Sequence, residues 1–187
     1  MKYFLMLVLA TLTLNSHAQD KYDYVAFNKL TEITGTEYVI ASVEHWGKLQ
    51  TQSRHLLFIN TNTGQANQLD FPSDAHIDKL EQVKIDNLGI NKIIVAAKTF
   101  DLNGKKGIDW EDPIQIIVLS TDGKEKTQLT DNKFFAGQWL VNKQTGRIVI
   151  TGYYDTNNNN KRDKKDKHEI LIYDLTTLKQ VGKAEMD

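Results

Sequence analysis

The chain has 187 residues, a formal net charge of -1 and no cysteine. A near-neutral charge gives no general attraction to nucleic acid or to an anionic membrane. Without cysteine, a disulfide framework, a Cys-based zinc site and a cysteine-anchored lipoprotein are all excluded.

The N-terminal residues predict a secretory signal peptide over 1–19. The positive Lys2 precedes an apolar run from Tyr3 to Leu14, and the small residues Ser16 and Ala18 then mark a cleavage region. The run is shorter than the ~20 apolar residues of a transmembrane helix, and no other segment reaches that length. We therefore expect a periplasmic or secreted protein without a membrane span; an uncleaved N-terminal anchor is the alternative.

The remaining residues, 20–187, are predicted to form one domain of three similar units, at about 22–72, 78–131 and 134–187. An offset of 54 places Ile94-Val95-Ala96 on Ile148-Val149-Ile150. The same offset pairs four Asp or Asn positions without a gap: Asp101 with Asp155, Asn103 with Asn157, Asp109 with Asp163, and Asp112 with Asp166. An offset of 60 adds a weaker third copy, with Leu56 to Ile59 on Ile116 to Leu119.

Each unit has the same order of parts: a β-rich run, a polar loop, a second run, a Gly or Asp turn and a short closing strand. Ile, Val, Tyr and Thr fill the runs, and no long stretch has a helical period. The predicted fold class is therefore all-β, with three tandem four-stranded antiparallel sheets that resemble propeller blades.

The segment from Asp101 to Thr130 resembles a TolB-type β-propeller repeat. That family carries a strand, a D-x-N-x-D-G-x-x-D-x-x-D loop, a second strand, an Asp-Gly turn and a closing Gln/Arg-Leu-Thr. The resemblance extends over Asp155 to Tyr173 of the third unit and is faint in the first. It implies a propeller that binds protein or small-ligand partners at its faces or central channel.

Three units do not make a complete propeller, which closes with ~4–8 blades. We expect two open sheet edges, and such edges invite pairing with another chain. A homodimer of two three-blade halves would form a six-blade ring. The alternative is an open chain whose edges are covered by its termini or by lysines.

The two Asp/Asn loops are predicted calcium sites, because oxygen ligands at alternate positions allow one loop to surround a hard cation. In the first loop the candidate ligands are Asp101, Asn103, Gly107 through its carbonyl, Asp109 and Asp112. In the second loop they are Asp155, Asn157, Asn159, Lys161 through its carbonyl, Asp163 and Asp166.

Several residues weaken this prediction. Lys105 occupies a ligand position, and Lys106 stands where an EF-hand loop has glycine; Asn160 holds that place in the second loop. Five cations between Lys161 and Lys167 repel calcium, so we expect roughly millimolar affinity. The alternative is a solvated loop in which Asp and Asn only form turns.

Other polar and aromatic residues suggest no chemistry. We expect the histidines at the surface or in loops: His45, His55, His76 and His168. Trp110 and Trp139 are expected to pack against the core or the loops. Nucleophile-elbow, zinc-protease and phosphate-loop motifs are absent from the sequence, and the basic run lacks the aromatics that favour nucleic acid.

The sequence thus predicts an exported, non-enzymatic binding module with calcium-stabilised loops and a protein or small-ligand partner. A structural protein that donates blades to another chain is the first alternative. A calcium-dependent propeller hydrolase, whose site forms only on oligomerisation, is the second.

Overall fold

The computed structural model describes residues 24–46, 51–105 and 107–186. They form three four-stranded antiparallel sheets, in which each strand pairs with the next along the chain. The first sheet contains β1 (Tyr24–Glu32), β2 (Tyr38–Trp46), β3 (Thr51–Asn60) and β4 (Ala66–Phe71). The second contains β5 (His76–Ile85), β6 (Ile90–Lys98), β7 (Gln115–Leu119) and β8 (Lys126–Gln128). The third contains β9 (Phe134–Asn142), β10 (Arg147–Tyr154), β11 (Lys167–Asp174) and β12 (Lys179–Met186).

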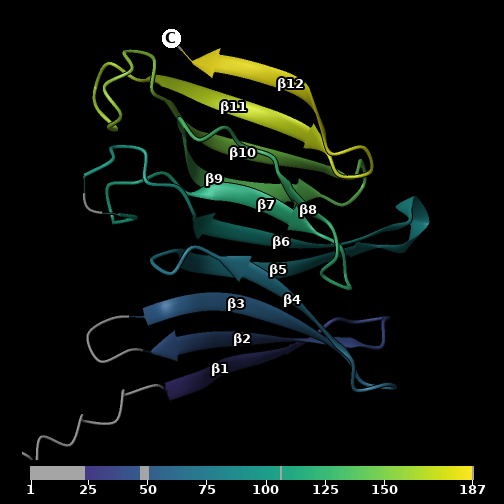
Figure 1. The fold of residues 1–187 in the computed structure, drawn as a ribbon. Helices are drawn as coiled ribbons and strands as arrows, with labels where there is room; N and C mark the ends of the chain where they lie inside the picture. The colour runs from purple at the N-terminus through teal and green to yellow at the C-terminus, as the bar shows by residue number, and fades with distance from the viewer. Residues whose placement is uncertain (1–23, 47–50, 106, 187) are drawn as a thin grey trace, which may run out of the picture.

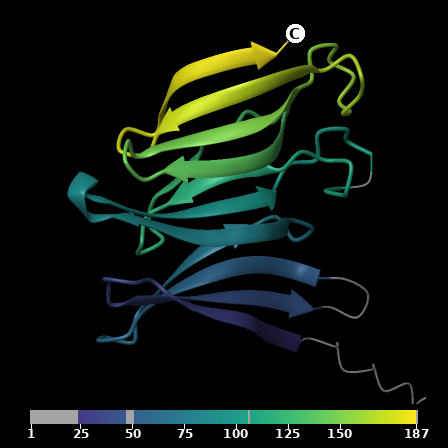
Figure 2. The same ribbon diagram turned by 180° about the vertical axis from the view of Figure 1, so that it is seen from behind.

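The sheets are stacked in chain order, with the second between the first and the third (Figure 1, and from behind in Figure 2). This arrangement confirms the predicted fold class of tandem, propeller-like blades, and over the described ranges the sheets do not close into a ring. A 3-10 turn, η1 (Asp86–Leu88), joins β5 to β6. In that same part of the chain, no helix has the length and apolar character to cross a membrane. The predicted signal peptide lies outside the described residues.

The two central strands of the middle sheet, β6 and β7, are buried on both faces, and this explains their almost unbroken apolar runs. Successive side chains of a strand point to opposite faces. Ile94 and Ile116 therefore pack in a cluster with the third sheet, whereas Ile93 and Ile117 pack in a separate cluster with the first. All four are at most 1% exposed, and full burial of such a side chain stabilises the fold by roughly 1.5–3 kcal/mol.

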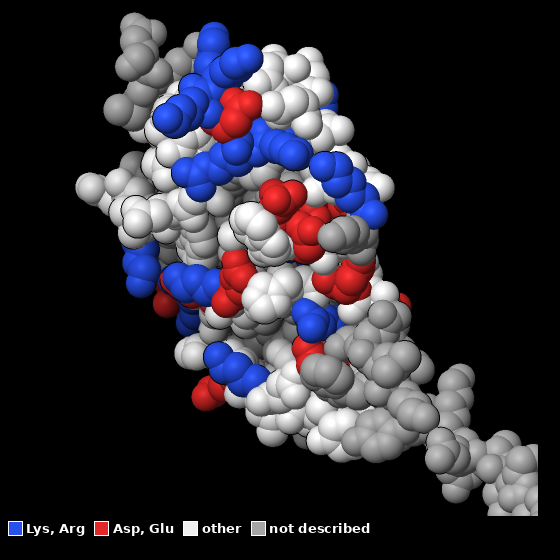
Figure 3. Space-filling view, turned by 90° about the vertical axis from the view of Figure 1, so that its left-hand side faces the viewer, with Lys and Arg blue, Asp and Glu red and all other residues white. Residues whose placement is uncertain are grey.

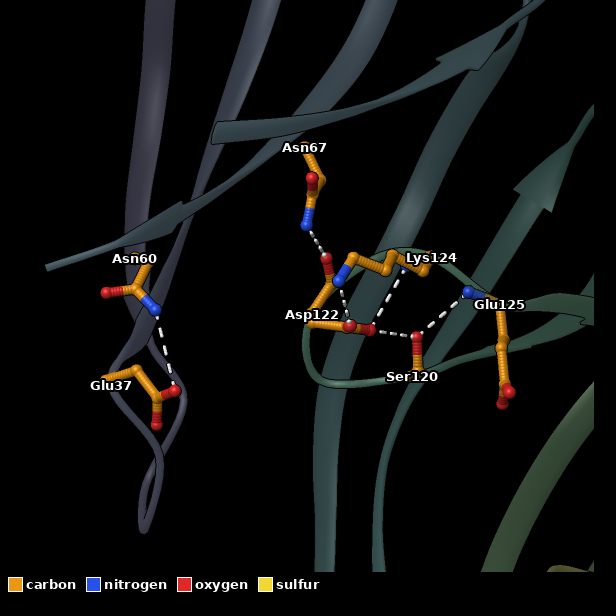
Figure 4. Close-up of polar contacts among 7 residues, drawn as sticks. All are labelled: Glu37, Asn60, Asn67, Ser120, Asp122, Lys124 and Glu125. Carbon is orange, nitrogen blue, oxygen red and sulfur yellow. Dashed lines mark hydrogen bonds and ion pairs between the residues drawn. The ribbon is translucent and has the colours of Figure 1, made fainter. Parts of the chain in front are cut away.

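A polar contact also joins the first two sheets, at the turn between β7 and β8. Asn67 Nδ2, on β4, donates a hydrogen bond to the backbone carbonyl of Asp122 at 2.9 Å (Figure 4). Ser120 Oγ donates to Asp122 Oδ1 at 2.6 Å, and this bond is the main cause that holds the pKa of Asp122 below its usual value. In the same view, Asn60 Nδ2 donates to Glu37 Oε1 within the first sheet.

Gly123 allows this turn to approach the first sheet closely. Its φ is 74°, and a Cβ at this position would overlap the ring of the fully buried Phe58. Gly64, in the corresponding turn of the first sheet, has a φ of 73°, but a Cβ there would have nothing within 4 Å. The two glycines share a left-handed backbone, which glycine adopts without steric cost, and differ in their surroundings.

We predict that Gly123→Ala destabilises the protein more than Gly64→Ala does. The left-handed backbone costs each variant roughly 1–2 kcal/mol, and the overlap with Phe58 adds about 1–3 kcal/mol to the first alone. Denaturant unfolding of the two variants measures the difference. Equal losses would show that the turn does not pack on Phe58.

Two expectations from the sequence are wrong. His55, expected at the surface or in a loop, lies in β3 and is 6% exposed; burial, and then the neighbouring His45, lower its pKa, although Asp70 acts in the opposite direction. Trp110, expected to pack, is 81% exposed. Trp139 does pack against the cluster between the second and third sheets.

Candidate functional site

Two long loops leave the same side of the sheet stack (Figure 1). The first acidic loop, residues 101–112, lies between β6 and β7, and the second acidic loop, residues 155–166, lies between β10 and β11. Seen from this side, Lys and Arg side chains gather over the third sheet, and Asp and Glu side chains gather nearer the middle of the stack (Figure 3). The corresponding connection of the first sheet, 47–50, lies outside the described residues.

The two acidic loops make matching hydrogen bonds at the positions that the sequence alignment pairs. In each loop, an Asn and an Asp each accept a hydrogen bond, through a side-chain oxygen, from the backbone N–H of the residue two positions later. The last Asp of the loop accepts a hydrogen bond from the backbone N–H of the residue three positions before it. In the first loop the N–H groups of Lys105, Glu111 and Asp109 donate to Asn103, Asp109 and Asp112. In the second loop those of Asn159, Lys165 and Asp163 donate to Asn157, Asp163 and Asp166.

The first Asp of each loop, Asp101 or Asp155, fixes the loop backbone by accepting hydrogen bonds from backbone N–H groups. Asp155 is 1% exposed, and its two carboxylate oxygens accept the N–H groups of Asn159 at 3.2 Å and Asn160 at 2.9 Å. Asp101 accepts the N–H groups of Gly104 and Gly107 in the same manner. Both aspartates therefore act as local anchors in this structure.

Left-handed residues allow the loops to turn around these carboxylates. Asn158 and Asn160 have φ values of 55° and 59°, a conformation that asparagine tolerates better than other side chains do. In the first loop, Gly104 and Gly107 take this conformation. Asn160, which stands where an EF-hand loop has glycine, is thus left-handed, whereas Lys106, its counterpart, lies outside the described residues.

The last aspartates of the two loops, Asp112 and Asp166, differ in the hydrogen bonding of one carboxylate oxygen, Oδ1. Asp112 is 3% exposed, and both of its oxygens are satisfied, Oδ1 by the N–H of Leu102 and Oδ2 by that of Asp109. Asp166 is 6% exposed, and its Oδ2 accepts the N–H of Asp163. Its Oδ1 is buried and has no hydrogen-bond partner. A buried carboxylate oxygen without a partner is costly.

The remaining candidate ligands of the second loop lie beside Asp163. The amide Nδ2 atoms of Asn157 and Asn159 donate to Asp163 Oδ2 at 3.2 and 2.6 Å. The backbone N–H of Lys165, followed by these amides, lowers the pKa of Asp163. Among the described residues, no three His, Cys, Asp or Glu side chains are already arranged to hold a metal ion.

The two predicted carbonyl ligands take part in the loops through their N–H groups. Gly107 N–H donates to Asp101 Oδ2 at 3.1 Å, and Lys161 N–H donates to Asn159 Oδ1 at 2.9 Å. Neither hydrogen bond uses the carbonyl oxygen, which is the atom that a calcium ion would contact.

A pocket of about 470 Å³ lies between the two loops. Its walls combine aromatic side chains with cations and two carboxylates: Trp110, Phe135, Tyr153, Lys98, Lys161, Arg162, Glu111 and Asp112. The guanidinium carbon of Arg162 lies 4.0 Å from the centre of the Tyr153 ring. Lys98 Nζ donates to the carbonyl oxygens of Trp110 and Asp112, at 2.7 and 2.8 Å, and so fixes the end of the first acidic loop. The sequence did not predict this pocket, because these residues are far apart in the chain and share no motif.

The fold places this chain in a structural class, the all-β proteins built from propeller-like blades. It does not identify a particular protein. No family model matches the chain, and no curated protein matches it. The likeness to TolB-type repeats therefore stays a prediction.

Two solved structures align with most of this chain at low similarity. The Pyrococcus horikoshii acylaminoacyl peptidase aligns with a TM-score of 0.46 and 11% identity over 87% of this chain and 25% of its own. The cobalt-substituted apocarotenoid oxygenase of Synechocystis aligns with a TM-score of 0.39 and 13% identity over 87% of this chain and 38% of its own. The chain spans well under half the length of either protein, and their activities do not carry over to it.

We predict that Asp155→Asn loosens the second acidic loop. One of its two acceptor oxygens is replaced by an NH₂ group that faces a backbone N–H, at a cost of about 1–3 kcal/mol. Hydrogen exchange of the Asn159 and Asn160 amides should become about tenfold faster or more. Asp101→Asn is the matched control and should leave those two amides unchanged; equal protection in both variants would contradict the anchor role.

Proposed function

We propose that this chain is an exported, propeller-like binding module whose second acidic loop binds calcium. The observation that carries this proposal is the buried, unpartnered Oδ1 of Asp166, in a loop that contains two further aspartates. The apolar N-terminal run supports export. The cationic and aromatic pocket beside the loop supports binding rather than catalysis.

Calcium suits the chemistry of this loop, because it prefers six to eight oxygen ligands from carboxylates, amides and backbone carbonyls. Asp155, Asp163 and Asp166 supply carboxylates, and a cation would give Asp166 Oδ1 the partner that the fold does not. Asn157 and Asn159 would turn their amide groups to present oxygen in place of Nδ2. The carbonyl of Lys161 would complete the set.

The first acidic loop is a weaker candidate for two physical reasons. Both oxygens of Asp112 already accept backbone N–H groups, so calcium would have to displace bonds instead of satisfying a free atom. Lys105, at a ligand position, cannot coordinate a cation. The two loops therefore form a natural comparison within one chain.

We predict that calcium raises the melting temperature of the wild-type protein through the second loop. A tenfold excess over Kd stabilises the folded state by about 1.4 kcal/mol, which corresponds to roughly 3–6 °C for a domain of this size. Asp166→Asn should remove this shift, and Asp112→Asn should keep it. Differential scanning calorimetry with 0–10 mM calcium measures both, with magnesium as the control ion.

Two outcomes would contradict the calcium site. The first is a wild-type melting temperature that does not move at about 10 mM calcium, ten times the affinity expected of such loops. The second is an Asp166→Asn variant that responds as the wild type does. Loss of the shift in Asp112→Asn, with the shift kept in Asp166→Asn, would move the site to the first loop.

The pocket between the loops is the proposed place for a ligand or for part of a protein partner. Three cations, Lys98, Lys161 and Arg162, outnumber the two carboxylates of the lining, Glu111 and Asp112. Trp110 and Tyr153 supply aromatic surface, so the pocket suits an anionic group attached to a flat apolar body. The guanidinium of Arg162 already stacks on the Tyr153 ring. The side chain of Arg162 would therefore lose less conformational entropy when a ligand binds.

We predict that benzoate binds this pocket and benzylammonium does not. The two probes share a ring and differ in the sign of their charge. Titration followed by NMR should shift the Trp110 indole and Arg162 side-chain signals with benzoate, and Arg162→Ala should weaken binding by about two- to fivefold. Identical responses to both probes, or shifts only at distant residues, would show that the pocket does not select anions.

A further inference from the structure

The outer face of the first sheet, which points away from the second, is apolar and open. Residues paired across antiparallel strands share a face, so the residues that alternate with the buried Ile40, Leu56 and Phe58 form this outer face. Its apolar members are Val25, Phe27, Leu30, Val39, Ala41, Val43, Leu57 and Ile59. Ala41 and Val43, beside His55, are buried on this face, so its exposed apolar part lies mainly along β1. Phe27 is 66% exposed and Leu30 is 71% exposed.

The outer face of the third sheet has the same character. Here the residues that alternate with the buried Ile148, Ile150 and Leu171 point outward. They include Leu140, Val149, Ile170 and Ile172, which pair with one another across β9, β10 and β11 or with Thr151. Leu140 is 71% exposed. In the described part of the chain, no further sheet lies beyond the first or the third (Figures 1 and 2), and the pairing places apolar residues on both of these outward faces.

These faces differ from the open edges that the sequence suggested. Each sheet keeps its own first and last strand at its edges, so pairing strands would not extend the stack. The contacts that hold the stack together are between faces, as the two clusters around the second sheet show. Continuation of the stack requires a sheet face packed on a sheet face.

We propose that the outer face of the first sheet binds the outer face of the third sheet of a second copy of this chain, and that two such contacts close a ring of six sheets. The second sheet already packs one apolar face on the inner face of the first sheet and its other apolar face on the inner face of the third, so contact between two apolar sheet faces is the interaction that holds this fold together. One chain therefore contains both halves of a head-to-tail contact.

The available area fits a stable dimer. Each outer face belongs to a sheet of four strands, most of which have eight or nine residues. With the usual strand spacing and rise per residue, such a face measures about 19 Å across the strands and about 26 Å along them, or roughly 500 Å². A closed pair of chains would cover four such faces, about 2,000 Å², which reaches the range of about 1,200–2,000 Å² for stable interfaces.

Charge and shape also favour contact between unlike faces. Glu32 and Asp70 lie on the outer face of the first sheet, whereas Arg147 and Lys179 flank Asp174 on that of the third. Glu32, Arg147 and Lys179 all lie next to the hairpin turns at the end of the stack away from the acidic loops. A hollow of about 650 Å³ lies at the β9 edge of the third sheet, where Leu140 and Val149 meet Trp139 and Lys79 of β5, and it leaves room for an apolar side chain from the other copy.

The test uses charge exchange between the two faces in the full chain. Wild-type protein at tens of micromolar should sediment as a dimer. Leu30→Lys alone and Leu140→Glu alone should each weaken the dimer at least tenfold, because a charge is placed against an apolar face. An equal mixture of the two variants should recover the dimer, since one contact then pairs Lys with Glu and the other is wild type.

The controls separate this arrangement from others. A single chain that carries both substitutions should also form dimers, and circular dichroism should show that every variant keeps its strands, because both residues are exposed. A monomeric wild type would overturn the proposal and leave these faces to another protein or another segment. Larger, growing assemblies would overturn ring closure, and a mixture that stays monomeric would overturn the contact between first and third sheets.

Discussion

Ile93 and Ile94 are neighbours in β6, yet each is buried in a different hydrophobic cluster. A strand can do this only when a sheet packs on each of its faces, so its residues must all be apolar and not alternate with polar ones. This requirement places the second sheet at the centre of the molecule. It also fixes the ends of β6 and β7, from which the first acidic loop begins and to which it returns.

The acidic loops show how small local differences change what a repeated segment can bind. Both loops share their turn-forming hydrogen bonds, which the side chains of Asn and Asp provide without any metal. Leu102 then donates its N–H to Asp112, whereas no group donates to Oδ1 of Asp166. The same sequence pattern thus gives one carboxylate that is satisfied by the fold and one that is not.

The sequence predicted the sheets well because strand alternation and turn residues are local signals. The runs around Ile94 and Ile148 predicted strands, and they form β6 and β10. The burial of His55 was not, because its surroundings come from the facing strand residue Val43 and from other strands. Nor could the sequence separate Asp166 from Asp112, since the difference depends on the path of the loop backbone in space. The pocket beside Arg162 brings together side chains from β6, β9, β10 and both loops, and no spacing along the chain predicts that assembly.

The two hydrophobic clusters do not merge, because the second sheet separates them. In its energetics the stack resembles a solenoid protein, because each sheet packs only on the sheets next to it. The first and third sheets each pack on one neighbour, so their local unfolding costs less free energy than unfolding of the middle sheet. Coupling between the first sheet and the third passes through the second sheet, whose strands β5, β6 and β7 each contribute side chains to both clusters.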